Sequence, residues 1–139
     1  MPPRGKRRQL ALEAPATAGH VGVLRRAVRG WLAEVVDDDA VDDLTLAVSE
    51  ALENAADHGF TGRSQPGTMS VTANVDDHGL CIVVSDDGSW RGPRSERHHR
   101  GRGLALMGQL TDVSTVRTGT GGTSVTLCRH ADPQRSAAG

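Results

Sequence analysis

The chain has 139 residues, of which 37% are hydrophobic and 24% are charged, with 16 basic against 17 acidic side chains. A chain of this length buries about two-thirds of the surface that its unfolded form exposes, so we expect one compact domain that needs no disulfide or structural metal. The net charge of −1 argues against a nucleic-acid-binding protein, since phosphate neutralisation needs a basic surface. Apolar runs are short and the basic start lacks a signal-peptide core, which indicates a cytoplasmic protein with no membrane contact.

The first half of the chain predicts a strand and two helices. Residues 1–8 are a basic flexible tail, and 9–13 can form a short strand before a helix that Thr17 would cap. Spacings of three and four predict an amphipathic helix on the apolar positions Val21, Leu24, Val28, Trp31, Leu32 and Val35. The acidic run 37–43 predicts a loop and the first turn of a second helix over 41–58, which Gly59 would end. Its apolar face is expected to consist of Leu44, Val48, Ala51, Leu52 and Ala55.

The second half predicts two hairpins and a short helix. Residues 69–75 alternate apolar and polar as a half-buried strand does, and 80–85 would return beside them as a more fully buried strand. A polar stretch over 86–100 precedes a short helix over 102–110 and two strands over 113–118 and 123–129, which the Gly119–Gly122 turn would join. Residues 130–139 are expected to be a disordered tail. Cys81 and Cys128 have no metal-ligand spacing around them, so we expect two small buried core thiols.

The order of these elements predicts an α+β domain over residues 9–129. It would be a two-layer sandwich, in which helices cover one face of a mostly antiparallel or mixed β-sheet.

Three glycine-bearing loops lie at the edges of predicted elements. They are 86–88 after a strand, 101–103 before a helix, and 119–122 before a strand. Glycine lets backbone N–H groups approach an oxyanion closely, and a helix that starts near Gly103 would favour a phosphate at its N-terminus. Any one of these loops, taken alone, is better explained as an ordinary turn.

A polar stripe on the second helix is the fourth candidate. Glu50, Asn54 and Asp57 lie within about 60° of one another, roughly opposite Leu44 and Val48. Such a stripe is normally the solvent face of a helix. However, Asn is unfavourable inside a helix, so Asn54 requires a reason. A carboxamide oxygen is a suitable ligand for Mg²⁺, which completes its octahedron with phosphate oxygens and waters.

Together these segments resemble the N, G1, G2 and G3 boxes of the histidine kinase-like ATPases, the GHKL proteins of the Bergerat fold. The four segments stand in the family's order and are Glu50-x-x-x-Asn54, Val84–Gly88, Gly101–Leu104 and Gly121–Thr123. Within this superfamily, residues 46–58 and 101–107 are similar to the stand-alone anti-sigma factor serine/threonine-protein kinases of bacterial partner-switching systems. The resemblance implies the Bergerat ATP-binding fold, with ATP and Mg²⁺ as cofactors.

The resemblance also implies a role for each matched residue. Asn54 would bind Mg²⁺, and Glu50 would be the base that activates the attacking hydroxyl. Asp86 would accept a hydrogen bond from the adenine amino group, since a base without that amino group leaves the carboxylate unpaired. The other expected nucleotide contacts are Gly88, which makes room for the base, Thr123 beside Asp86, Gly122 in the last box, and Gly101, Arg102, Gly103 and Leu104 around the phosphates.

The implied partners are a sigma factor and a small anti-anti-sigma protein of the STAS type, and the resemblance leaves open whether the protein is a homodimer. Residues 89–100 depart from the family, because the loop is short for an ATP lid and Ser89-Trp90 replaces a frequent glycine. This Arg- and His-rich loop fits either contact with a phosphate or acidic partner, or a solvated surface. Three functions compete: a kinase that phosphorylates its antagonist, an ATP-binding module that regulates a partner without phosphoryl transfer, and a small domain whose glycine loops are only turns. Glu50 favours the kinase.

Overall fold

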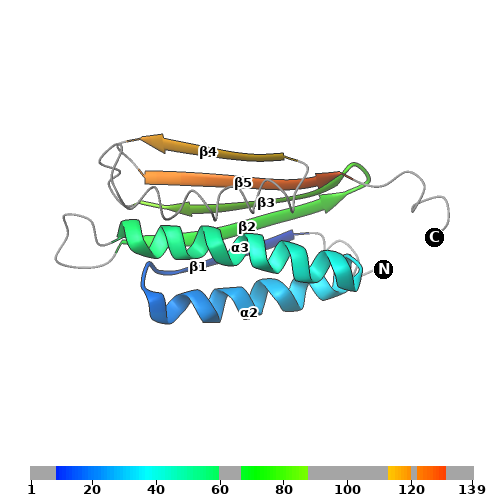
Figure 1. Ribbon diagram of the computed structural model, residues 1–139, viewed down its shortest axis with the longest axis horizontal. Coiled ribbons are helices and arrows are strands. Elements are labelled where there is room, and N and C mark those ends of the chain that lie inside the picture. Colours follow the sequence, from blue (N-terminus) through cyan, green and yellow to red (C-terminus); the bar gives the residue numbers. More distant parts are fainter. Residues whose placement is uncertain (1–8, 60–66, 88–112, 120–121, 131–139) are drawn as a thin grey trace.

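The computed structural model describes residues 9–59, 67–87, 113–119 and 122–130. In this part of the chain, two helices and five strands form two layers (Figure 1). In chain order they are β1 (Gln9–Pro15), α2 (Ala18–Val35), α3 (Asp38–Gly59), β2 (Thr68–Asp76), β3 (Gly79–Asp86), β4 (Val113–Gly119) and β5 (Gly122–His130). The expected two-layer α+β architecture is therefore confirmed.

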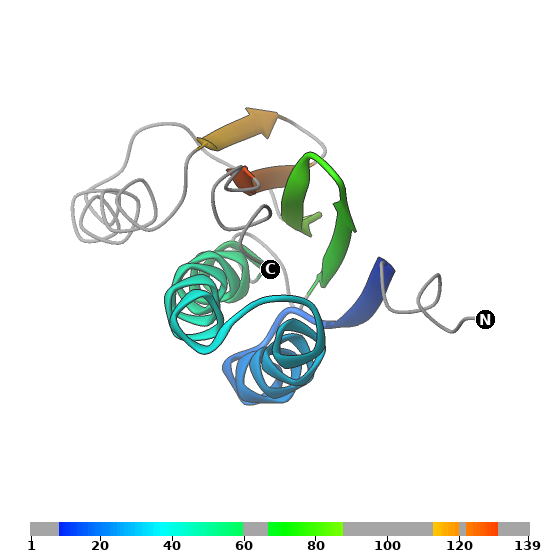
Figure 2. The ribbon, with the colours of Figure 1, turned by 90° about the vertical axis from the view of Figure 1, so that its right-hand side faces the viewer.

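The sheet has the strand order β1-β2-β3-β5-β4, and every neighbouring pair is antiparallel. The two predicted hairpins, β2–β3 and β4–β5, lie side by side because β3 pairs with β5. An end-on view shows both helices on one face of the sheet (Figure 2). Helix α2 contacts β1, and α3 contacts β2, β3 and β5. The opposite face of the sheet has no helix over it among the described residues.

Helix α2 buries the apolar stripe that its sequence predicts, with Val21, Leu24, Val28, Trp31 and Leu32 in the core. Thr17 does stand at the N-cap position, but its hydroxyl does not bond a backbone N–H. The hydroxyl oxygen lies 2.8 Å from Nδ1 of His20 instead. The predicted capping role of the Thr17 side chain is therefore wrong, because the His20 ring takes the hydroxyl.

Helix α3 begins at Asp38, three residues before the predicted start. The Asp37 carboxylate accepts a hydrogen bond of 2.9 Å from the backbone N–H of Ala40, and Asp38 and Asp39 occupy the first turn. Acidic side chains stabilise a helix N-terminus through capping and through the helix dipole, which explains the earlier start. Neither α2 nor α3 combines the length and hydropathy that a bilayer-spanning helix needs.

The core lies between the sheet and the two helices. Its largest fully buried side chains are Leu32, Leu44, Leu52, Met69, Ile82 and Leu127. Strand β3 is more fully buried than β2, as the apolar run 80–84 predicted, but its open face is not buried throughout. Leu80, Ile82 and Val84 are buried, whereas Cys81 between them is exposed.

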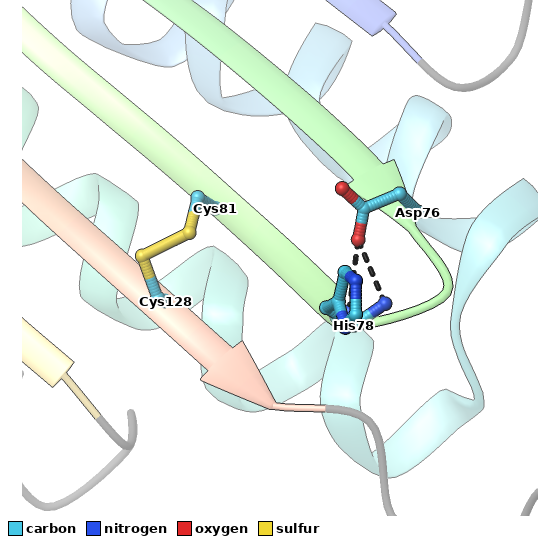
Figure 3. Close-up of a disulfide and its surroundings, with 5 residues drawn as sticks. Asp76, His78, Cys81 and Cys128 are labelled. Carbon is cyan, nitrogen blue, oxygen red and sulfur yellow. Dashed lines mark hydrogen bonds between the residues drawn. A yellow bond between two sulfur atoms is a disulfide. The ribbon is translucent and has the colours of Figure 1, made fainter.

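The two cysteines form a disulfide on the sheet face away from the helices (Figure 3). Cys81 of β3 stands directly opposite Cys128 of β5 in the antiparallel register, with their Cα atoms 4.1 Å apart. A close pair of this kind is typical of a non-hydrogen-bonded rung. The expectation of two buried core thiols is therefore wrong, because the strand alternation turns both side chains outward and the register brings them together.

Candidate functional site

The candidate site lies at the end of the sheet where β3 ends and β5 begins. Asp86 is the last residue of β3, and it pairs directly with Thr123, the second residue of β5. Both side chains are buried, with exposures of 8% and 6%. Helix α3 runs antiparallel to β5, so its C-terminal half, with Glu50 and Asn54, lies toward the same end (Figure 1). The fold thus gathers residues from three of the four predicted boxes.

Asn54 is buried, with an exposure of 7%, although a polar stripe on a helix normally faces solvent. Three residues along a helix correspond to a rotation of about 60°, so Asn54 borders the buried face that Ala51 marks. Asp57 on the same stripe is exposed and Glu50 is half-buried. The ordinary interpretation of the stripe as a solvent face therefore holds for Asp57 and not for Asn54, the residue for which the sequence required another reason.

Two buried polar atoms at this end have no hydrogen-bond partner among the described residues, Oδ1 of Asn54 and Oγ1 of Thr123. A buried polar atom without a partner is destabilising by about 1 to 3 kcal/mol, so it calls for a ligand or another explanation. Nε1 of Trp31 and Oγ1 of Thr45 on the helices also have no partner in the described part of the chain. Only Asn54 and Thr123 belong to segments for which the sequence predicted ligand contacts.

Gly122 is required by a close approach of two backbones. Its φ is +133°, which L side chains rarely adopt, and a Cβ atom there would overlap the carbonyl oxygen of Asp86. The same Cβ would lie 2.8 Å from the Asp86 carbonyl carbon and 2.9 Å from Cα of Asp87. The glycine of the fourth box therefore lets β5 start directly against the residue that the second box contributes.

Asp87 lies in the second box, and the resemblance implies no role for it. Its side chain accepts a hydrogen bond of 2.8 Å from the backbone N–H of Thr68, and its own N–H donates to the Thr68 carbonyl at 3.1 Å. Asp directly after a strand commonly makes such side chain to backbone bonds, which is the signal that the sequence carried.

The remaining predicted site residues lie outside the described part of the chain. They are Gly88, Gly101, Arg102, Gly103 and Leu104, together with the loop 89–100. Among the described residues, no group of three His, Cys, Asp or Glu side chains could hold a metal ion. A cation beside Asn54 would therefore take most of its ligands from a bound phosphate and water, as Mg²⁺ usually does.

The arrangement can recognise a flat heterocycle that carries an amino group. Asp86 supplies a buried acceptor, Thr123 beside it supplies a buried hydroxyl, and Asn54 supplies an unpartnered amide oxygen that suits a hard cation. The residues present therefore fit a nucleotide with its Mg²⁺. A two-layer α+β domain with this set defines a nucleotide-binding ATPase class of protein.

Comparison with known proteins agrees with this class. The pattern of the histidine kinase-like ATPase domain matches residues 14–129, which include all the site residues that the structure describes. The serine-protein kinase RsbW of Bacillus licheniformis is 32% identical over 142 residues, covering 91% of this chain and 88% of that protein. The RsbW of Bacillus subtilis is 28% identical with the same coverage. The chain belongs to the histidine kinase-like ATPase family, in the branch of the RsbW serine-protein kinases.

A solved structure is similar in fold as well. The crystal structure of the RsbU and RsbW domains of Rv1364c from Mycobacterium tuberculosis superimposes with a TM-score of 0.71 at 30% identity. The match covers 90% of this chain and 33% of that one, so this chain corresponds to about a third of the larger protein.

Proposed function

We propose that the protein is an ATP-dependent serine/threonine kinase that acts as an anti-sigma factor and phosphorylates its anti-anti-sigma antagonist. The observation that carries the proposal is the gathering of buried Asp86, Thr123 and Asn54 at one end of the fold, with two of their polar atoms unpartnered. The relatives named serine-protein kinase RsbW support the same activity.

In this proposal, recognition of the base depends on β3 and β5. The Asp86 carboxylate accepts a hydrogen bond from the exocyclic amino group of adenine, and the Thr123 hydroxyl bonds the same ring system. A guanine offers a carbonyl at that position, so an acceptor instead of a donor would face the buried carboxylate. This makes Asp86 the residue that selects ATP over GTP.

Helix α3 supplies the residues for phosphoryl transfer. Asn54 would hold Mg²⁺ through Oδ1, and the ion supplies charge neutralisation for the phosphates. Glu50 stands one helical turn before Asn54 and is half-buried. In this proposal its carboxylate lies beside the bound nucleotide, where a protein substrate reaches it from solvent. There it accepts the proton of the substrate Ser or Thr hydroxyl and orients the hydroxyl oxygen for attack.

The proposed partners are a sigma factor and a small STAS-type antagonist, which the resemblance to the anti-sigma kinases implies. Phosphorylation would release the antagonist and leave the protein free to sequester the sigma factor in the cytoplasm. The two partners thus compete, and the kinase step decides which one is bound.

A transfer assay with Glu50 tests the proposal. The protein is incubated with labelled ATP, Mg²⁺ and purified STAS-type proteins encoded near its gene, and phosphorylated Ser or Thr is located by mass spectrometry. Glu50→Ala should slow transfer by roughly 10² or more, the usual contribution of a positioned base, while nucleotide and sigma factor still bind. Asp57→Ala, an exposed acid on the same helix, is the matched control and should transfer at the normal rate. Binding of ATP without transfer to any antagonist, and with sigma-factor release unchanged in Glu50→Ala, would replace the kinase with a passive ATP-binding regulator.

A further inference from the structure

Asp87 joins the end of β3 to the start of β2 by two hydrogen bonds. The backbone N–H of Asp87 donates to the Thr68 carbonyl at 3.1 Å, and Oδ1 of Asp87 accepts from the Thr68 N–H at 2.8 Å. The last paired residues of the two strands are Met69 and Asp86, so Thr68 and Asp87 would be the next pair of the ladder. In an ordinary antiparallel pair both acceptors are backbone carbonyls. Here the Asp87 carboxylate replaces one of them.

These two bonds fix the peptide that joins Asp86 to Asp87. Because the carboxylate serves the Thr68 N–H, the backbone carbonyl of Asp87 is not needed for that bond. The neighbouring residue Gly67 is held as well, since its carbonyl accepts a hydrogen bond of 2.8 Å from the N–H of Ala16. The β2 side of Asp86 is therefore anchored through Asp87 and Thr68 to the end of β1.

The β5 side of Asp86 is fixed by contact. Gly122 lies so close to the Asp86 carbonyl that no larger residue fits there. The Asp86 backbone is thus held between Gly122 on one side and the bonds of Asp87 on the other. A buried carboxylate that must meet one amino group needs such a fixed backbone, because small displacements lengthen the hydrogen bond that gives selectivity.

We propose that Asp87 is a positioning residue, whose carboxylate holds the end of β3 so that Asp86 selects an amino-bearing purine. The inference rests on the proposed adenine site at Asp86. Asp87 acts through Asp86 and not through direct contact with the nucleotide. Its loss should therefore weaken binding of adenine nucleotides and leave the weak binding of guanine nucleotides unchanged.

The other end of the same hairpin offers a matched control. Asp76 is also an exposed aspartate whose Oδ1 accepts backbone hydrogen bonds, from His78 at 2.8 Å and Gly79 at 3.3 Å (Figure 3). Asp76→Ala removes side chain to backbone bonds from the turn that joins the same two strands, at the end away from Asp86. Any general weakening of the hairpin is therefore shared by Asp76→Ala and Asp87→Ala.

The experiment compares affinities of the full chain for ADP and GDP with Mg²⁺ by calorimetry. Asp87→Ala should bind ADP about three- to tenfold more weakly, the usual effect of one lost hydrogen bond, and its preference for ADP over GDP should fall by the same factor. Asp87→Asn keeps an acceptor oxygen and should bind within about twofold of the wild type, as should Asp76→Ala. In the Asp86→Asn background, Asp87→Ala should cause no further loss, because the carboxylate that it positions is absent.

Equal ADP affinity and selectivity in Asp87→Ala and Asp76→Ala would overturn the positioning role, and so would a full additional loss in the Asp86→Asn background. These outcomes leave the adenine site intact. A wild-type protein that binds neither nucleotide, or an Asp86→Asn variant with unchanged selectivity, would instead remove the adenine site and the positioning role together.

Discussion

The two ends of the β-sheet differ in how their polar groups are satisfied. At the hairpin end, where β2 turns into β3 and β5 stops, Asp76 bonds the turn, Cys81 is joined to Cys128, and Arg129 reaches Asp43 of α3 at 3.3 Å. At the site end, where β3 stops and β5 begins, Asn54 and Thr123 have buried polar atoms without a partner among the described residues.

This difference indicates a division of work within one small domain. Cross-links at the hairpin end hold α3 and the strands together, whereas the groups at the site end that lack partners among the described residues are the proposed ligand contacts. Proteins often depart from full polar satisfaction at functional sites and compensate elsewhere in the fold. If the division holds, changes at the hairpin end should alter stability without altering nucleotide affinity, and changes at the site end should alter affinity.

Reduction of the disulfide should have the largest effect on stability. Cys81 and Cys128 are 47 positions apart, and a cross-link of that span stabilises a protein by about 4 kcal/mol in the chain-entropy description. Chemical denaturation with and without a small-thiol reductant measures the loss, while ADP affinity of the folded protein should stay within about twofold. The double variant with Ser at both positions should no longer respond to reductant. A wild type that is equally stable in both conditions would show that the cross-link does not form in solution.

Gly122→Ala should lower the free energy of unfolding by about 2 to 3 kcal/mol, because the left-handed φ is unfavourable for Ala and the new methyl group meets the Asp86 backbone. Nucleotide binding should fall with it, since Asp86 must move. Gly30→Ala is the control, as Gly30 lies in α2 with open space around it. That exchange should stabilise the protein by about 0.5 to 1 kcal/mol, because Ala is the better helix former. Denaturation curves of the two variants that shift in the same direction would contradict the role of the Gly122 contact.

Periodicity predicted the helices and strands well, but for β3 it did not show which face of the strand packs against the helices. Spacings of three and four in α2 and strict alternation in β2 identified the buried residues Val21, Leu24, Met69 and Val71. The run 80–84 is apolar at every position, so nothing in it distinguishes the covered face of β3 from the open one. The exposure of Cys81 follows only from the helices lying on one side of the sheet.

For the candidate site, the sequence predicted which residues take part, but it did not predict how they contact one another. Asp86 and Thr123 are 37 positions apart, and the resemblance to a family grouped them before any pairing was known. Their direct pairing depends on β5 lying between β3 and β4, which no local pattern in the chain encodes. The bonds between Asp87 and Thr68 depend in the same way on the register of β2 with β3. Burial of Asn54 likewise requires the position of α3 on the sheet.

Asp86→Asn should reduce the affinity for ATP and ADP by about 1 to 3 kcal/mol, since the amide can present a donor where adenine needs an acceptor. In the wild type, ADP or ATP with Mg²⁺ at 100 times the dissociation constant should stabilise the fold by about 2.7 kcal/mol, and GTP should not. Thermal unfolding with each nucleotide measures both effects. Equal stabilisation by GTP would remove the selecting role of Asp86. No stabilisation by any nucleotide would leave the site end without its proposed ligand.

Loss of the ion pair between Arg129 and Asp43 should have the smallest effect. The two side chains are 27% and 45% exposed, so solvent screens the attraction, and Arg129→Met should lower the free energy of unfolding by only about 0.5 to 1 kcal/mol. A double-mutant cycle with Asp43→Asn isolates the pair, and high salt should reduce its coupling. This ion pair is the most direct test of whether the two ends are independent. Helix α3 carries Asp43 at the hairpin end and Asn54 at the site end, about 16 Å apart along the helix. Unchanged ADP affinity in Arg129→Met would show that the two ends of the sheet act independently. A severalfold loss of ADP affinity would show that α3 transmits a shift from the hairpin end to Asn54. The ion pair that anchors α3 would then contribute to nucleotide binding as well as to the stability of the fold.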